Sequence, residues 1–145
     1  MRDLHNNIKV VRAITPAAVG TSGIGGGQLS PVIDRRGYEA VEFLVSHGTA
    51  GATSDTTSVV IYECATSDGS FTSVANADLI GTEAAAGLPA QATARTSGTG
   101  KNIAKGVGYK GTKRYLKIRL YGTGHATGIV SAEAVMHRAG LAPVA

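Results

Sequence analysis

A glycine run in the second half of the chain is the first pattern whose spacing could serve chemistry. Gly106-Val107-Gly108-Tyr109-Lys110-Gly111 has the GxGxxG spacing with which dinucleotide-binding proteins bring their backbone close to a pyrophosphate. That motif needs a strand before it and a helix after it, because the helix N-terminus binds the phosphates. Here a β-type run follows the glycines. We therefore interpret them as the glycine-rich start of a strand, and we expect no cofactor.

A second glycine pattern resembles the phosphate-binding loop of nucleotide hydrolases. It is Gly98-Thr99-Gly100-Lys101. The loop motif also needs a glycine five residues before its second glycine, and a serine or threonine after its lysine. Arg95 and Asn102 occupy those positions. The residue types therefore exclude this motif.

The four histidines give no metal-ligand pattern. His5, His47, His125 and His137 include no pair at helical i, i+4 spacing, and no cysteine or carboxylate clusters with them. They are more typical of solvated or hydrogen-bonding side chains. There is no Gly-x-Ser-x-Gly nucleophile motif, and the ten acidic residues are scattered. We expect a protein that is not an enzyme; a small hydrolase stays open only because a sequence cannot place carboxylates in space.

Positive charge is concentrated in one segment. No acidic residue occurs between Glu83 and Glu133, and eight basic residues lie between positions 95 and 119. They are Arg95, Lys101, Lys105, Lys110, Lys113, Arg114, Lys117 and Arg119.

The end of this basic segment has strict two-residue alternation. Leucines and isoleucines at 116, 118 and 120 alternate with tyrosines and cations, which predicts a half-buried strand. We predict that its polar face docks on an acidic protein surface, because tyrosine and arginine are favoured interface anchors. A solvated face is the second interpretation, and stacking on single-stranded nucleic acid is the third. The predicted docking residues are Arg114, Tyr115, Lys117, Arg119 and Tyr121.

The elements that must position this face are short strands separated by turn residues. Period-two runs rich in Val, Ile and Tyr predict strands over 8–14, 38–46, 58–65, 114–121 and 128–138, with a shorter one over 32–35. Gly122 to Gly124 separates the last two runs as a hairpin turn would. A single turn of helix fits within 77–86. No crossover helices separate the strands, so the sequence predicts an all-β, antiparallel β-sandwich.

Two small-residue segments do not show a clear strand pattern. The stretch 84–108 is dominated by Ala, Gly, Thr and Ser, and a structureless loop of this length is unusual in a compact domain. We interpret it as an extended loop or arm that orders against a partner. A strand hidden by small residues is the alternative. The segment 20–30 is a second candidate arm.

Composition limits the remaining possibilities. The 145 residues suit a single domain, 1–145, with net charge +4. Charged residues make up only 17%, below the ~25% of typical domains, so we expect much of the surface to contact protein and the chain to form a dimer or trimer. Cys64 is the lone cysteine, the first nine residues are too polar for a signal peptide, and no apolar run could span a membrane.

Several segments resemble, in order, one class of small virion proteins of tailed bacteriophages. The resemblance covers most of the chain outside roughly 84–106 and includes a polar start, Asp3-Leu4-His5-Asn6-Asn7-Ile8. It rests on three further segments: Asp34-Arg35-Arg36-Gly37-Tyr38-Glu39-Ala40-Val41, Ser67-Asp68-Gly69-Ser70-Phe71-Thr72 and Gly108-Tyr109-Lys110-Gly111-Thr112-Lys113-Arg114-Tyr115.

The resemblance implies a capsid decoration or cement protein with a jelly-roll-like sandwich. Such a protein would bind the major capsid protein on the outer surface of the virion, after synthesis in the bacterial host cytoplasm. The family has no catalytic residues to carry over, and no motif fixes its interface residues. A tail or head-to-tail joining protein, and a nucleic-acid-binding β module, stay open as alternatives.

Overall fold

The computed structural model describes residues 5–20, 25–91, 94–96, 101–123 and 128–139. Strands make up most of the described chain, and the helical elements are single turns. In chain order the elements are η1 (His5–Asn7), β1 (Ile8–Ala18), β2 (Gln28–Leu29), β3 (Ile33–Asp34), β4 (Tyr38–His47), β5 (Thr56–Cys64), β6 (Thr72–Ser73), η3 (Asn76–Asp78), β7 (Leu79–Ile80), α1 (Glu83–Ala86), β8 (Ile103–Tyr109), β9 (Tyr115–Thr123) and β10 (Ile129–Ala139).

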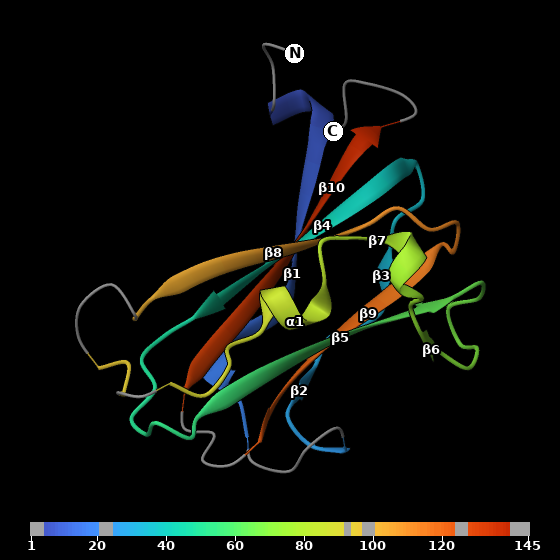
Figure 1. The fold of residues 1–145 in the computed structure, drawn as a ribbon. Helices are drawn as coiled ribbons and strands as arrows, with labels where there is room; N and C mark the ends of the chain where they lie inside the picture. Colours follow the sequence, from blue (N-terminus) through green and yellow to red (C-terminus); the bar gives the residue numbers. More distant parts are fainter. Residues whose placement is uncertain (1–4, 21–24, 92–93, 97–100, 124–127, 140–145) are drawn as a thin grey trace.

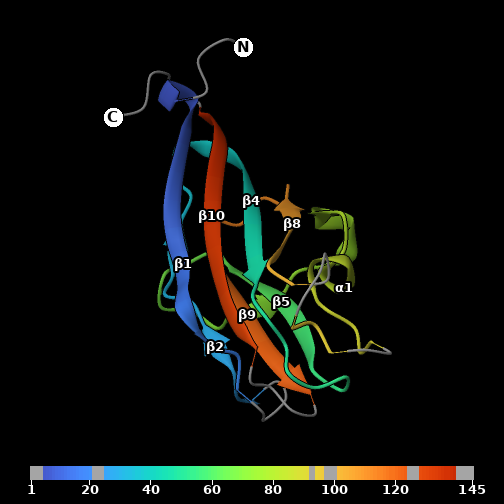
Figure 2. The same ribbon diagram turned by 90° about the vertical axis from the view of Figure 1, so that its left-hand side faces the viewer.

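The strands form two antiparallel sheets that pack face to face (Figure 1). Sheet A has the order β1-β10-β4-β8-β7, and sheet B has the order β2-β9-β5-β6, with β3 also paired to β9. Figure 2 shows β1, β10 and β4 side by side along sheet A. The expected all-β, antiparallel sandwich is confirmed.

The strand order is that of a jelly roll. The first half of the chain pairs with the second half in reverse, because β1 pairs with β10, β2 and β3 with β9, and β4 with β8. This doubled chain is then rolled up, so that β10 also pairs with β4 and β9 with β5. Successive strand pairs thereby fall in opposite sheets, and the two inner faces enclose one core.

The core lies between the two sheets and follows the alternation of the sequence. β4, β9 and β10 each turn every second residue inward, as the period-two runs predict. Burying each large apolar side chain contributes roughly 1.5–3 kcal/mol. The inward residues of these three strands are Val41, Phe43, Val45, Leu116, Ile118, Leu120, Val130, Ala132, Ala134 and Met136.

The expected hairpin between the last two strands is wrong. β9 lies in sheet B and β10 in sheet A, so they are not paired with each other. The glycines at 122–124 are compatible with either a hairpin or a crossing between sheets. The jelly-roll order requires the crossing, because the partners of β10 are β1 and β4.

The expectation of an arm over 84–108 is also wrong in part. Residues 103–109 form β8, in register with β4 from Ile103 opposite His47 to Tyr109 opposite Val41. The alternative of a strand hidden by small residues is therefore correct for this part. Before it, α1 and residues 87–91 run along the gap between β5 and β8, and Leu88 bridges to Thr57 (Figure 1). In the other candidate arm, 20–30, β2 pairs with β9.

Candidate functional site

β9 occupies the centre of sheet B and carries four of the five predicted docking residues on its outer face. Leu116, Ile118 and Leu120 are fully buried in the core. Because side chains alternate along a strand, Tyr115, Lys117, Arg119 and Tyr121 point away from the core, and all four are half-buried. We call these four residues the β9 face. The structure thus places them together.

Strand β5 and the residue before β6 add aromatic side chains that the sequence pattern did not assign to this face. Tyr62 of β5 lies opposite Lys117, and Phe71 lies beneath it, with the Lys117 ammonium 4.2 Å from the ring centroid. Val60 and Ser58 lie opposite Arg119 and Tyr121. Outward positions on β5 and β9 carry no carboxylate. The result is an aromatic and cationic surface on two paired strands.

Arg114 differs from the other four residues because its charge is already paired. Its Nε and Nη2 donate to the two carboxylate oxygens of Asp34 at 2.8 and 2.6 Å. This pairing holds the pKa of Asp34 at about 2. The guanidinium also lies 4.8 Å above the Tyr115 ring. Arg114 therefore fixes β3 against the start of β9 and offers a partner little free charge.

Arg119 is also held in place, although at the edge of the β9 face. Its Nη1 donates to the Gly26 carbonyl at 3.0 Å, which ties the segment before β2 to β9. A side chain fixed in this way loses less conformational entropy when it contacts a partner than a free one does.

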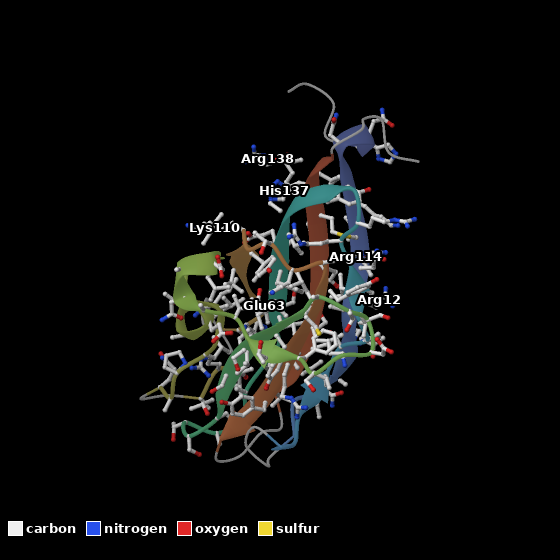
Figure 3. The ribbon with its side chains drawn as sticks, turned by 90° about the vertical axis from the view of Figure 1, so that its right-hand side faces the viewer. Arg12, Glu63, Lys110, Arg114, His137 and Arg138 are labelled. Carbon is white, nitrogen blue, oxygen red and sulfur yellow. The ribbon has the colours of Figure 1, made fainter. Side chains whose placement is uncertain are left out.

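Two of the segments that carry the bacteriophage resemblance meet in space and form a structural corner around Arg35. Arg35 is only 8% exposed, and its guanidinium lies 5.2 Å from the Tyr109 ring centroid. The Tyr109 hydroxyl donates to Glu63 at 2.6 Å and accepts the Lys113 amide at 2.9 Å. Glu63 and Arg114 are labelled in Figure 3. The carbonyls that accept from Arg35 belong to Tyr38, Glu39, Gly111 and Lys113.

This corner gives the segments 34–41 and 108–115 a structural role that involves no reaction or ligand. One buried cation donates to four carbonyls at the β3–β4 and β8–β9 connections and joins the two connections. Burial and the hydrogen bond to Glu63 raise the pKa of Tyr109 well above its usual range, so the phenol stays protonated. No pattern in the sequence indicates the contacts of Arg35, Tyr109 and Glu63, because their partners are distant in the chain.

The GxGxxG glycines serve packing. Gly106 and Gly108 lie within β8, where the Glu42 carboxylate rests against the positions their Cβ atoms would take. Gly111 lies in the following turn, against the Tyr109 ring. A turn and β9 follow, so no helix N-terminus faces these glycines. Our interpretation as the start of a strand needs one correction: two of them belong to the strand before the turn. Of the rejected phosphate loop, residues 98–100 lie outside the described part of the chain.

The basic segment does not form one surface. Arg95 is buried, and it donates to the carbonyls of Asp55 and Pro89. Lys105 donates to the Gly87 carbonyl at 2.7 Å. Lys110 and Lys113 are exposed in the turn before β9. Of the eight basic residues, the β9 face contains only Lys117 and Arg119.

One groove and one half-buried carboxylate stand out among the described residues. A groove of about 490 Å³ lies between β5 and residues 83–89 and is bordered by Tyr121. Glu83 is the one titratable carboxylate on its described lining, and it accepts the Ile61 amide at 2.6 Å. Burial raises the pKa of Glu83. Across the described residues, no three His, Cys, Asp or Glu side chains cluster as metal ligands would.

Of the histidines, His5 is exposed, His137 is half-buried on β10, and His125 lies outside the described residues. His47 is 2% exposed and bonds through Nε2 to the Ala86 carbonyl at 2.9 Å.

Comparison of the sequence with protein-family models and with curated proteins finds no match. Within the described residues there is no helix with the length and hydrophobicity to cross a membrane. What the structure defines is a class: a jelly-roll β-sandwich with an aromatic and cationic face on sheet B.

Proposed function

We propose that the chain is a non-enzymatic structural protein of a bacteriophage virion, which binds the outer capsid surface as a decoration or cement protein. The β9 face is the observation that carries this proposal. It presents Tyr115, Lys117, Arg119 and Tyr121 on a central strand, with Tyr62 and Phe71 beside them. The sequence resemblance supports the same role, and the jelly-roll order agrees with the fold which that resemblance implies.

The physical basis is burial of surface across joints between capsid subunits. Stable interfaces of this kind bury on the order of 1,000 Å² or more. Aromatic rings supply contact area at low entropic cost, and cations select an acidic partner surface. The major capsid protein is the proposed partner, and the acidic surface would lie on its outer side.

A second copy of the chain is the proposed occupant of the opposite face. Four of the six exposed large hydrophobic residues among the described residues are on outward positions of sheet A: Val10, Leu44, Ile80 and Ile129. The β9 face would repel itself because both of its cations would be brought together. The outer face of sheet A is therefore the better surface for self-association, and we call it the sheet A face.

Capsids that lack the protein test the proposal. Added chain is expected to co-sediment with them and to raise their heat resistance. Lys117→Glu is expected to abolish binding while lowering the stability of the isolated chain by no more than about 1 kcal/mol, the size of the lost contact with the Phe71 ring. Lys110→Glu is the matched control, since Lys110 has the same charge but lies off the β9 face. Failure of the wild-type chain to bind, or equal loss in both variants, rejects the assignment of this face.

The same variants separate the alternatives. A nucleic-acid-binding module would bind oligonucleotides with an affinity that falls steeply with salt, and Lys117→Glu would weaken that binding. A tail or head-to-tail joining protein would form closed rings in isolation, which native mass measurement detects. We expect neither oligonucleotide binding at low salt nor rings.

A further inference from the structure

Residues 83–91, which we call the strap, close the gap between the two sheets. The strap begins with α1 and lies between β5 of sheet B and β8 of sheet A (Figure 1). Ala86 and Leu88 of the strap are buried. The Leu88 amide and carbonyl bond to the Thr57 carbonyl and amide at 2.8 and 2.9 Å. The strap is thus joined to β5 as a short piece of sheet.

Four successive carbonyls of the strap each accept from a different donor. His47 of β4 donates to Ala86, Lys105 of β8 donates to Gly87, and the Thr57 amide of β5 donates to Leu88. The Arg95 guanidinium donates to Pro89. Three of the four donors are basic side chains: His47 and Lys105 belong to sheet A, and Arg95 lies outside both sheets. The donor from sheet B is the Thr57 backbone amide.

His47 is the titratable member of this set. A carbonyl oxygen can only accept, so Nε2 carries the hydrogen and Nδ1 carries the lone pair. Nδ1 is buried and has no hydrogen-bond partner among the described residues. The His47 residue borders a cavity of about 10 Å³, which has room for about one water. The neutral ring therefore fits this place, and a proton on Nδ1 would have no acceptor from the protein.

The two cations near His47 also oppose protonation. Lys105 approaches from β8, and Arg95 approaches from the segment after the strap. Asp55 borders the same cavity, and its negative charge would act in the opposite direction; its Oδ2 accepts the Ala52 amide at 3.0 Å. Glu83, the acid of the strap itself, accepts from the Ile61 amide. A charged His47 would become a third cation beside two others in a site that water hardly reaches.

We propose that His47 makes the strap pH-sensitive: protonation of Nδ1 in mild acid releases residues 83–91 from between the two sheets. Release would solvate the imidazolium and expose Leu88 and the β5 edge. The inference goes beyond the proposed capsid role and does not depend on it.

The direction of the effect follows from proton linkage. Burial lowers the pKa of His47, the Ala86 hydrogen bond opposes this, and Lys105 and Arg95 lower the pKa further. In the open strap the ring would have its ordinary pKa, about 6.5. Opening therefore takes up a proton, and the closed strap loses stability as the pH falls below about 6.5. The closed strap stops losing stability once it also binds the proton. Until then, the equilibrium constant for opening increases by up to about tenfold for each pH unit of acidification.

Amide hydrogen exchange of the isolated chain tests this. Protection factors, which correct for the pH dependence of exchange itself, are compared at about pH 7.5 and about pH 5.5. Protection of the Leu88 and Thr57 amides is expected to fall at the lower pH, while that of the β1–β10 ladder stays constant. In His47→Gln the Leu88 and Thr57 protection is expected not to change with pH, because glutamine can still donate to Ala86 but cannot titrate.

His137→Gln is the matched control and is expected to behave as wild type. Constant protection in the wild-type strap overturns the proposal, and so does an equal fall in His47→Gln, which would assign the effect to Glu83. If His47→Gln does not fold, the ring titration of wild-type His47 by NMR decides. A midpoint as high as that of an exposed histidine, with the Leu88 amide still protected, overturns the proposal.

Discussion

Arg35 and Arg36 are neighbours of the same type, yet they have different roles. Arg35 is buried and donates to carbonyls of four residues at the corner between two connections. The side chain of Arg36 is exposed, and its backbone amide bonds to Asp34 at 2.9 Å. The pair shows that the charge of a residue says little about its contribution until its acceptors are known.

Arg35→Ala is expected to lower the free energy of unfolding by roughly 1–3 kcal/mol, because it removes the donor of four hydrogen bonds, and the one to the Gly111 carbonyl is fully buried. Arg36→Ala should change it by less than about 0.5 kcal/mol, as exposed substitutions usually do. Urea unfolding of both variants measures the difference. Equal effects would contradict the role assigned to Arg35.

Asp34 gives a pH-dependent test of the ion pair with Arg114. Its pKa in the folded chain is about 2, below the ordinary value near 3.9, so its stabilising effect is present above about pH 4. That effect is lost as the pH falls through about 2. Asp34→Asn should therefore be less stable than wild type near neutral pH, and the difference should shrink in acid. The comparison is made at low salt, because this exposed pair is screened.

At the scale of elements, β8 shows why small residues hide a strand. Its outward positions are Ala104, Gly106 and Gly108, so no polar residue alternates with the inward Val107 and Tyr109. The glycines make room for the Glu42 side chain of the neighbouring strand, whose carboxyl pKa is raised by burial. The partner strand therefore explains the composition of β8, and the local sequence does not.

The turn after β8 provides a prediction about an element. A Cβ at Gly111 would lie 2.5 Å from the Tyr109 hydroxyl oxygen and 2.6 Å from the ring carbon that bears it. Gly111→Ala should displace the ring from Glu63 and lower the free energy of unfolding by roughly 1–3 kcal/mol. Gly25→Ala is the control, because nothing lies within 4 Å of its added methyl. Thermal unfolding of the two variants should separate them clearly.

At the scale of the whole molecule, the sandwich has two broad outer faces of different chemistry. The β9 face is aromatic and cationic, whereas the sheet A face carries exposed apolar side chains, with Glu42 lying against glycines. A protein with two such faces can contact a partner on one side and its own copies on the other. Figure 3 shows a further exposed region at the end of β10, with His137 and Arg138 labelled; Arg138 pairs with Glu39 there.

The sheet A face predicts a defined self-association. Native mass measurement is expected to find a dimer or trimer, and Leu44→Lys should shift it toward monomer, because a charge would be buried in the contact. Leu29→Lys is a close control: Leu29 is 44% exposed and Leu44 is 43% exposed, but Leu29 belongs to sheet B. A monomer in the wild type, or dissociation by both variants, would rule out this surface.

The sequence alone determined the strands with regular alternation and the common face of Tyr115, Lys117, Arg119 and Tyr121. Leu116, Ile118 and Leu120 predict the inward face of β9, because the two-residue period of a strand is a local property. The sequence also predicted a strand, and not the helix of the dinucleotide motif, after the GxGxxG glycines, and β9 follows them in the structure.

Only the tertiary structure decided which strands pair, and with that the roles of the other residues. Arg35 and Lys113, or His47 and Ala86, are far apart in the chain, and no local pattern joins them. The rolled order of the sheets also placed β9 and β10 in different layers, which turned an expected hairpin into a crossing. Hydrogen bonds between distant segments depend on the closed fold, so the Arg35 corner and the strap could be found only there.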